Sequence, residues 1–119
     1  AVYRLDPGLS IHKLESGIKC SNGPCWSPDN KTFYFCYSYD KVMYAYDYDI
    51  ETGKVANRRS FLTAWEYPGT FDGSTVDAEG YIWNAHVFGG RIIRYSPKGE
   101  IDRMIEFPVR KIEIGGISV

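Results

Sequence analysis

Hydrophobic and polar residues alternate along most of this chain with the two-residue period of β-strands. The run VMYAYDYD at residues 42–49 places its tyrosines on one face, and Met43, Ala45 and its two aspartates on the other. No segment keeps a helical period, so we expect little helix. The predicted strands cover residues 1–6, 11–15, 24–27, 32–37, 42–49, 55–61, 74–77, 81–86, 91–96 and 100–107.

One arrangement of residues occurs twice. The first copy begins at Asn22 with NGPCWSPDNKTFYF and continues with VMYAYDYD, and the second begins at Asp72 with DGSTVDAEGYIW and continues with RIIRYS. Equivalent residues are separated by 50 positions at Asn22 and Asp72, and by 46 positions at Phe61 and Phe107. This spacing is typical of a four-stranded propeller blade.

The repeat predicts an all-β fold of four-stranded antiparallel blades, part of a β-propeller. Residues 1–21 are interpreted as the end of one blade, 22–61 as one blade, 72–107 as the next blade and 108–119 as the start of a further blade. A closed ring needs about four to eight blades, whereas this chain holds about two and a half. Since each blade stacks on its neighbours, we expect the chain to need missing propeller blades or companion chains.

Composition narrows the classes of function. Acidic and basic residues are interspersed with a net charge of −1, so we expect no nucleic-acid partner. No apolar run approaches the roughly 20 residues of a membrane span, and the first residues lack the features of a signal peptide, so we expect no membrane partner. Cys20, Cys25 and Cys36 lack zinc-knuckle spacing. As structural free thiols they favour a reducing, cytoplasmic location.

Four strings together resemble the senescence marker protein, gluconolactonase and regucalcin family. They are SNGPCWSPDNKTFYF, YAYDYDIETGKVANRRSF, FDGSTVDAEGYIW and GGRIIRYSPKGE, and the likeness covers about residues 2–109. The resemblance implies a six-bladed propeller that binds one divalent cation in its central channel and hydrolyses sugar lactones. It also implies a protein longer than this chain.

Carried over by position, the resemblance implies that Asn22 is a metal ligand through its side-chain carbonyl. It likewise implies that Asp72 is a carboxylate ligand and general base. Such oxygen ligands suit Ca²⁺, Mg²⁺ or Mn²⁺ and do not exclude Zn²⁺. A cation would polarise the lactone carbonyl while Asp72 takes a proton from the attacking water. The family's early-blade Glu and middle-blade Asn have no counterpart here, so water or missing blades must complete the site.

Other interpretations of these residues are open. Asn-Gly and Asp-Gly are common turn dipeptides, so Asn22 and Asp72 taken alone would be turn residues. His86 ends a strand that starts near the predicted channel; it is either a substrate contact or a packed or surface histidine. The remaining acidic residues of the two copies are expected to be solvated charges of turns or strand faces: Asp29, Asp47, Asp49, Asp77 and Glu79.

The sequence therefore predicts a gluconolactonase-like enzyme that hydrolyses a sugar lactone with a divalent cation, this chain being a fragment that alone is inactive. One alternative is a non-catalytic propeller that binds calcium or protein as a scaffold, because one fold hosts many functions. Another is an organophosphate or aryl ester hydrolase that uses similar oxygen ligands.

Overall fold

The computed structural model describes residues 2–8, 10–15, 21–37, 41–63, 70–87 and 90–108. Every regular element in these ranges is a β-strand. The described residues contain no helix with the length and apolar character to cross a membrane. The strands are β1 (Val2–Leu5), β2 (Ile11–Glu15), β3 (Ser21–Trp26), β4 (Thr32–Tyr37), β5 (Val42–Asp49), β6 (Lys54–Thr63), β7 (Thr70–Val76), β8 (Ile82–Val87), β9 (Arg91–Tyr95) and β10 (Ile101–Glu106).

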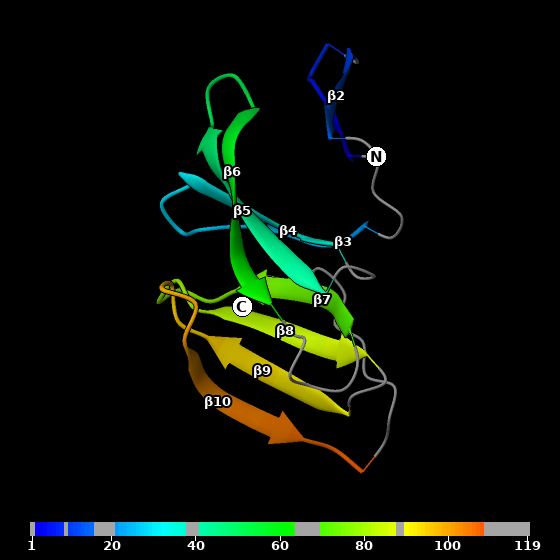
Figure 1. Ribbon diagram of the computed structural model, residues 1–119. Coiled ribbons are helices and arrows are strands. Elements are labelled where there is room, and N and C mark those ends of the chain that lie inside the picture. Colours follow the sequence, from blue (N-terminus) through cyan, green and yellow to red (C-terminus); the bar gives the residue numbers. More distant parts are fainter. Residues whose placement is uncertain are drawn as a thin grey trace.

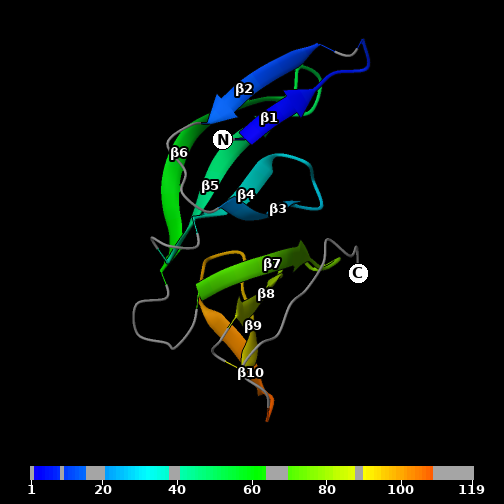
Figure 2. The ribbon, with the colours of Figure 1, turned by 90° about the vertical axis from the view of Figure 1, so that its right-hand side faces the viewer.

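The strands form two four-stranded antiparallel sheets and one two-stranded hairpin. The first sheet has the order β3-β4-β5-β6 and the second has the order β7-β8-β9-β10, while β1 pairs with β2. Both large sheets are meanders, in which each strand pairs with the next strand along the chain. The first strand of each large sheet, β3 or β7, is called its innermost strand. These two strands pack against each other (Figures 1 and 2). The two copies of the sequence motif therefore become two equivalent sheets that meet at the same edge.

Equivalent turns of the two sheets are closed in the same way. The turn between β3 and β4 has a hydrogen bond from Asn30 N to Ser27 O at 2.9 Å, and the turn between β7 and β8 has one from Gly80 N to Asp77 O at 3.0 Å. Asn30 and Gly80 both adopt a positive φ, at 59° and 84°. Asn and Gly are the residues that occupy this left-handed region at the lowest cost.

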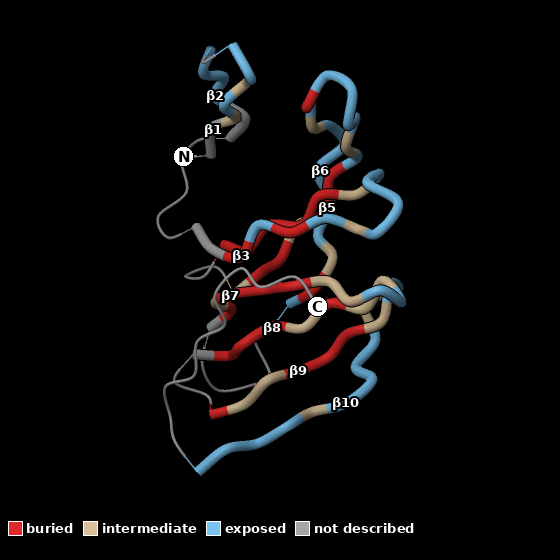
Figure 3. Tube along the Cα trace, turned by 180° about the vertical axis from the view of Figure 1, so that it is seen from behind, coloured by how far each residue is buried: buried red, intermediate tan, exposed pale blue. Residues whose placement is uncertain are grey.

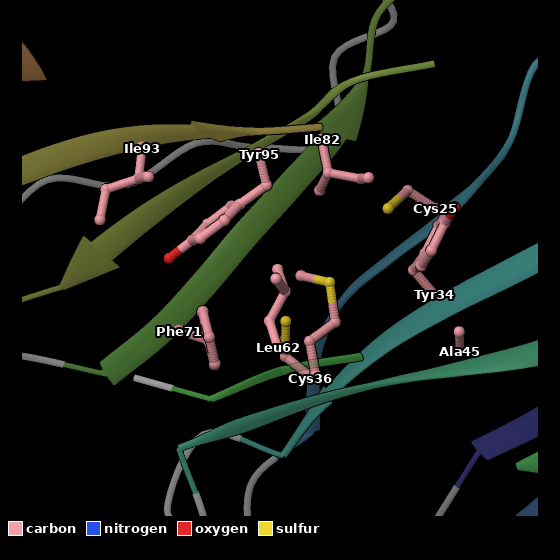
Figure 4. Packing of buried hydrophobic residues seen from close by; sticks show 10 residues of the cluster. Cys25, Tyr34, Cys36, Ala45, Leu62, Phe71, Ile82, Ile93 and Tyr95 are labelled. Carbon is pink, nitrogen blue, oxygen red and sulfur yellow. The ribbon is translucent and has the colours of Figure 1, made fainter. Parts of the chain in front are cut away.

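Two apolar clusters lie on the two faces of the first sheet. The cluster between the sheets draws on seven strands, and Figure 4 shows its side chains converging from both sheets. Figure 3 shows buried residues along the central strands, while β10 is mostly exposed. The inter-sheet cluster contains Cys25, Tyr34, Cys36, Met43, Ala45, Leu62, Phe71, Ile82, Ile93 and Tyr95. The second cluster contains Phe33, Phe35, Tyr37, Val42 and Tyr46.

The alternation predicted for residues 42–49 is confirmed by these clusters. Met43 and Ala45 face the second sheet, whereas Val42 and Tyr46 lie in the cluster on the opposite face. The tyrosines of β5 therefore pack within the fold, and their aromatic rings stabilise the sheet through edge contacts, such as the 4.7 Å centroid separation of Tyr37 and Tyr44.

The innermost strands begin earlier than the sequence predicts. Strands were expected at residues 24–27 and 74–77, but β3 begins at Ser21 and β7 begins at Thr70. Asn22-Gly23 and Asp72-Gly73 therefore lie inside strands, and their interpretation as turn dipeptides is wrong. The predicted further strand at the end of the chain lies outside the described residues.

Candidate metal and substrate site

The two predicted cation ligands lie at irregularities of the innermost strands, Asn22 as the last paired residue before a register shift and Asp72 within one. The register of β3 with β4 shifts between Asn22 and Cys25. The register of β7 with β8 shifts between Phe71 and Ser74. Each shift accommodates one extra residue, which is a β-bulge. Bulges change the direction in which side chains leave a strand and are frequent beside functional sites.

Gly23, the residue after Asn22, lies directly against the backbone of Asp72. A Cβ atom on Gly23 would be 2.7 Å from the carbonyl oxygen of Asp72, 2.7 Å from Ser74 Oγ and 3.0 Å from Ser74 N. Gly23 also has a φ of 61°, which an L side chain rarely adopts. Only glycine permits this approach without a shift of β7. The two motif positions are thereby brought together at the contact between the sheets.

The surroundings of Asp72 are described more fully than those of Asn22. The side chain of Asn22 lies outside the described part, which includes only its backbone in β3. Asp72 is half-buried, and the residues on either side of it in β7, Phe71 and Gly73, are buried. Asp72 is therefore partly accessible to solvent between two buried neighbours.

The chemistry of the two predicted ligands fits a hard divalent cation. An Asp carboxylate and an Asn side-chain carbonyl are both oxygen donors, the type that Ca²⁺, Mg²⁺ and Mn²⁺ prefer. Asn22 and Asp72 supply two of the about six donors that such a cation needs. The described residues hold no group of three or more His, Cys, Asp or Glu side chains that could bind a metal. Any cation at this site therefore takes further ligands from water or from other residues.

His86, the predicted substrate contact, is fully buried in β8. Its Nε2 lies 3.1 Å from the hydroxyl of Tyr95, and its ring meets the Phe71 ring edge-on at 5.2 Å between centroids. Burial lowers the pKa of His86 to about 4, and the positive charges of Arg91 and Lys41 add to this effect. The structure thus places a neutral His86 in the packed interior, and its role as a substrate contact stays a prediction.

Two cysteines pack within the inter-sheet cluster. Cys25 and Cys36 are free and buried. Burial raises the pKa of Cys25 to about 12 and also raises that of Cys36, so both thiols are protonated at neutral pH. This is the structural role predicted for them. Cys20 lies outside the described residues.

Asp77 is not the solvated charge that the sequence predicts. Its carboxylate accepts hydrogen bonds from Trp83 Nε1 at 2.9 Å and from Arg94 Nη2 at 2.8 Å, and Arg94 lies 3.8 Å above the Tyr81 ring. Burial acts to raise the pKa of Asp77, but the hydrogen bonds from Trp83 and Arg94 outweigh it and lower the pKa. Arg94 also donates a hydrogen bond to Asp102 of β10 at 2.9 Å. Arg94 therefore links the turn between β7 and β8 to the outermost strand of the second sheet.

The sequence alone did not single out Asn84, which is the polar residue most closely tied to the bulge at Asp72. Its Nδ2 lies 3.1 Å from the carbonyl oxygen of Asp72, 3.3 Å from that of Gly73 and 2.6 Å from Ser74 Oγ. Comparing the two copies of the repeat provides a signal, since the residue equivalent to Asn84 in the first copy is Phe35. A polar residue at a position that is apolar in the other copy suggests a local function.

Comparison with known proteins identifies relatives of this chain. The family model described as the SMP-30/gluconolactonase/LRE-like region matches residues 1–114. The pentonolactonase XacC of Haloferax volcanii is 35% identical over 111 residues, and the regucalcin of Homo sapiens is 38% identical over 112 residues. Each alignment covers 93% of this chain and 38% of the relative. The chain thus spans little more than a third of the length of these relatives.

A solved structure shares the fold. The regucalcin of Agrobacterium tumefaciens, described as a calcium-binding protein, superposes with a TM-score of 0.83 and 31% sequence identity over 88% of this chain and 36% of that protein. The two four-stranded antiparallel sheets are therefore arranged as in the regucalcin-like propellers. The inner strands β3 and β7 carry the candidate ligands within this arrangement.

Proposed function

The chain belongs to the SMP-30/gluconolactonase/LRE-like family, and we propose that the protein hydrolyses a sugar lactone with a bound divalent cation. Asn22 and Asp72 are two of the ligands of that cation, and Asp72 is also the general base. The observation that supports this assignment is the contact of β3 with β7, where Gly23 lies against the backbone of Asp72. Similarity to a pentonolactonase supports a lactone as the substrate class.

The two ligands have different tasks because only one is charged. A bound cation would polarise the lactone carbonyl and make hydroxide accessible near neutral pH. Asn22 contributes a neutral oxygen and Asp72 a single negative charge, so this pair leaves the cation a net positive charge toward the substrate. Asp72 has a second carboxylate oxygen that is suited to accept the proton of the attacking water. General-base assistance of this kind contributes about 10²- to 10⁴-fold in rate.

Lactone hydrolysis by the purified protein tests the proposal. Turnover of sugar lactones is measured with added Ca²⁺, Mg²⁺, Mn²⁺ or Zn²⁺ and again after chelation with EDTA. The substitution Asp72→Asn keeps the shape of the side chain but removes its charge and its basicity. We expect it to lower kcat by at least about 100-fold.

The matched control is Asp47→Asn, which changes an exposed aspartate on β5 that contacts Asn57 at 2.7 Å and Arg59 at 3.0 Å. This variant should retain wild-type turnover. A wild-type kcat in Asp72→Asn would show that Asp72 is not the general base. Turnover that persists in EDTA would show that the reaction needs no cation.

A calcium-binding protein without catalysis is the second candidate, supported by the regucalcin relative that is described as calcium-binding. The same preparations separate the two functions. Calcium binding that Asp72→Asn abolishes, together with no turnover of any sugar lactone by the wild type, would favour this second function.

A further inference from the structure

Asn84 is a buried amide with no part in the proposed chemistry. It lies in β8, directly opposite Ser74 of β7, and no part of its side chain reaches solvent. A buried polar group is costly unless it forms hydrogen bonds. The two N–H groups of the Asn84 amide are shared among oxygens of three consecutive residues in β7, whereas Asn84 Oδ1 has no hydrogen-bond partner among the described residues.

The equivalent position in the first sheet shows that the blade itself does not need this amide. The repeat aligns Ser74 with Pro24 and Asn84 with Phe35. Phe35 is buried in an apolar cluster, and Pro24 offers no donor. Both sheets shift register in this stretch of the inner strand, with the shift one residue later in the first sheet; one has apolar residues at these two positions and the other has a polar pair. The polar pair accompanies the sheet that carries the predicted carboxylate ligand.

The contacts of Asn84 fix the backbone on both sides of Gly73. The carbonyl of Asp72 belongs to the peptide plane before Gly73, and the carbonyl of Gly73 belongs to the plane after it. Both carbonyl oxygens lie within 3.3 Å of Asn84 Nδ2. Gly73 without an amide beside it would have wide conformational freedom. Holding the plane between Asp72 and Gly73 restricts the backbone of Asp72, and with it the direction in which its side chain leaves β7.

Ser74 completes this arrangement. Its hydroxyl oxygen accepts from Asn84 Nδ2 at 2.6 Å and lies 3.7 Å from Cys36 Sγ in the first sheet. The same hydroxyl is one of the atoms nearest to Gly23. Asn84 is thus connected through one hydroxyl group to the close approach of the two sheets.

We propose that Asn84 is a positioning residue for Asp72: its side-chain amide holds the bulge at Gly73 so that the Asp72 carboxylate is presented to a divalent cation. This inference rests on the proposed role of Asp72 as a cation ligand. Asn84 itself contacts neither cation nor substrate; it acts through the backbone of Asp72. Preorganised ligands bind more tightly than mobile ones because less conformational freedom is lost on binding.

Calcium affinity of the purified protein, measured by isothermal titration calorimetry, tests the proposal. Asn84→Leu removes the donor and fills the buried site with an apolar side chain of similar size, and Asn84→Ala removes it without adding bulk, so one variant remains if the other does not fold. The control is Ile82→Val, a change on the same face of β8 that is also fully buried but lies opposite Val76, away from the bulge.

We expect each Asn84 variant to bind Ca²⁺ about tenfold more weakly than the wild type, and Ile82→Val to bind as the wild type does. The amide resonances of Gly73 and Ser74 should also shift or broaden in the Asn84 variants and not in the control. Unchanged Ca²⁺ affinity in the folded Asn84 variants would overturn the inference. A wild-type protein that binds no Ca²⁺ at Asp72 would overturn it as well.

Lactone turnover is recorded separately. A wild-type protein that binds Ca²⁺ through Asp72 but opens no lactone refutes the proposed enzyme activity alone. The role of Asn84 is then decided by the Ca²⁺ affinities.

Discussion

Replacing Gly23 by alanine tests the close approach of β3 and β7, on which the candidate site depends. The new methyl group meets two oxygen atoms at 2.7 Å, one of them the carbonyl of Asp72, and the nitrogen of Ser74 at 3.0 Å. Two of these three atoms belong to the backbone, which moves only if β7 moves. The substitution must therefore separate the two inner strands or distort the bulge at Asp72.

The magnitude has two contributions. Forcing an L residue to keep the φ of 61° at Gly23 costs about 1–2 kcal/mol. Inserting a methyl group into a packed contact costs about 1–3 kcal/mol more, because the surrounding backbone must shift. Together they lower the free energy of unfolding by about 2–5 kcal/mol.

Gly80→Ala supplies the control because it shares only the first contribution. Gly80 has a φ of 84°, but a Cβ there would meet only Pro97 Cγ at 3.5 Å and Pro28 Cδ at 3.8 Å, which are ordinary contacts. We expect this variant to lose only about 1–2 kcal/mol. Both variants are compared by urea denaturation, followed by titration with Ca²⁺.

Gly23→Ala should be the less stable variant and should bind Ca²⁺ more weakly than the wild type, whereas Gly80→Ala should bind it normally. Equal losses of stability in the two variants would contradict the described contact between β3 and β7. If Gly23→Ala loses the expected stability but binds Ca²⁺ as the wild type does, the contact between β3 and β7 is not required for the cation site.

Two further predictions concern buried titratable groups. Because the pKa of His86 is lowered from 6.5 to about 4, its stabilising effect is complete above about pH 6.5 and is lost as the pH falls toward 4. The free energy of unfolding falls by about 3 kcal/mol over this range. His86→Leu should abolish this pH dependence, as measured by urea denaturation at a series of pH values. An unchanged pH dependence in the variant would contradict the buried position of His86. Arg94→Met should raise the pKa of Asp77 in an NMR titration, so that acid unfolding begins at a higher pH, while the exposed Arg103→Met leaves that pKa unchanged. The same pKa of Asp77 in both variants would show that Arg94 does not lower it.

The periodicity of the sequence predicts most of the fold because strand alternation is a local signal. The run at residues 42–49 coincides with β5, and its two faces enter two different clusters. The beginnings of β3 and β7 are not predicted, because Asn-Gly and Asp-Gly carry the same sequence signal whether they form a turn or a bulge. Only the neighbouring strands, which pair across the bulge, distinguish the two.

The candidate site is only partly visible in the sequence. The resemblance to a family predicted Asn22 and Asp72, but not the amide beside them, because Asn84 is ten residues and one strand away from Ser74. Asp77 was assigned to solvent because a charge in a turn usually is solvated, and Arg94 lies a further strand away along the chain. Both errors involve side chains that meet only after the strands have paired.

A crystal structure with Mn²⁺, located by its anomalous scattering, tests the central claim most directly. One peak with both the side-chain carbonyl of Asn22 and the carboxylate of Asp72 at about 2.0–2.4 Å would agree with a shared cation site. A peak bound to only one of the two residues, or none near either, would contradict it.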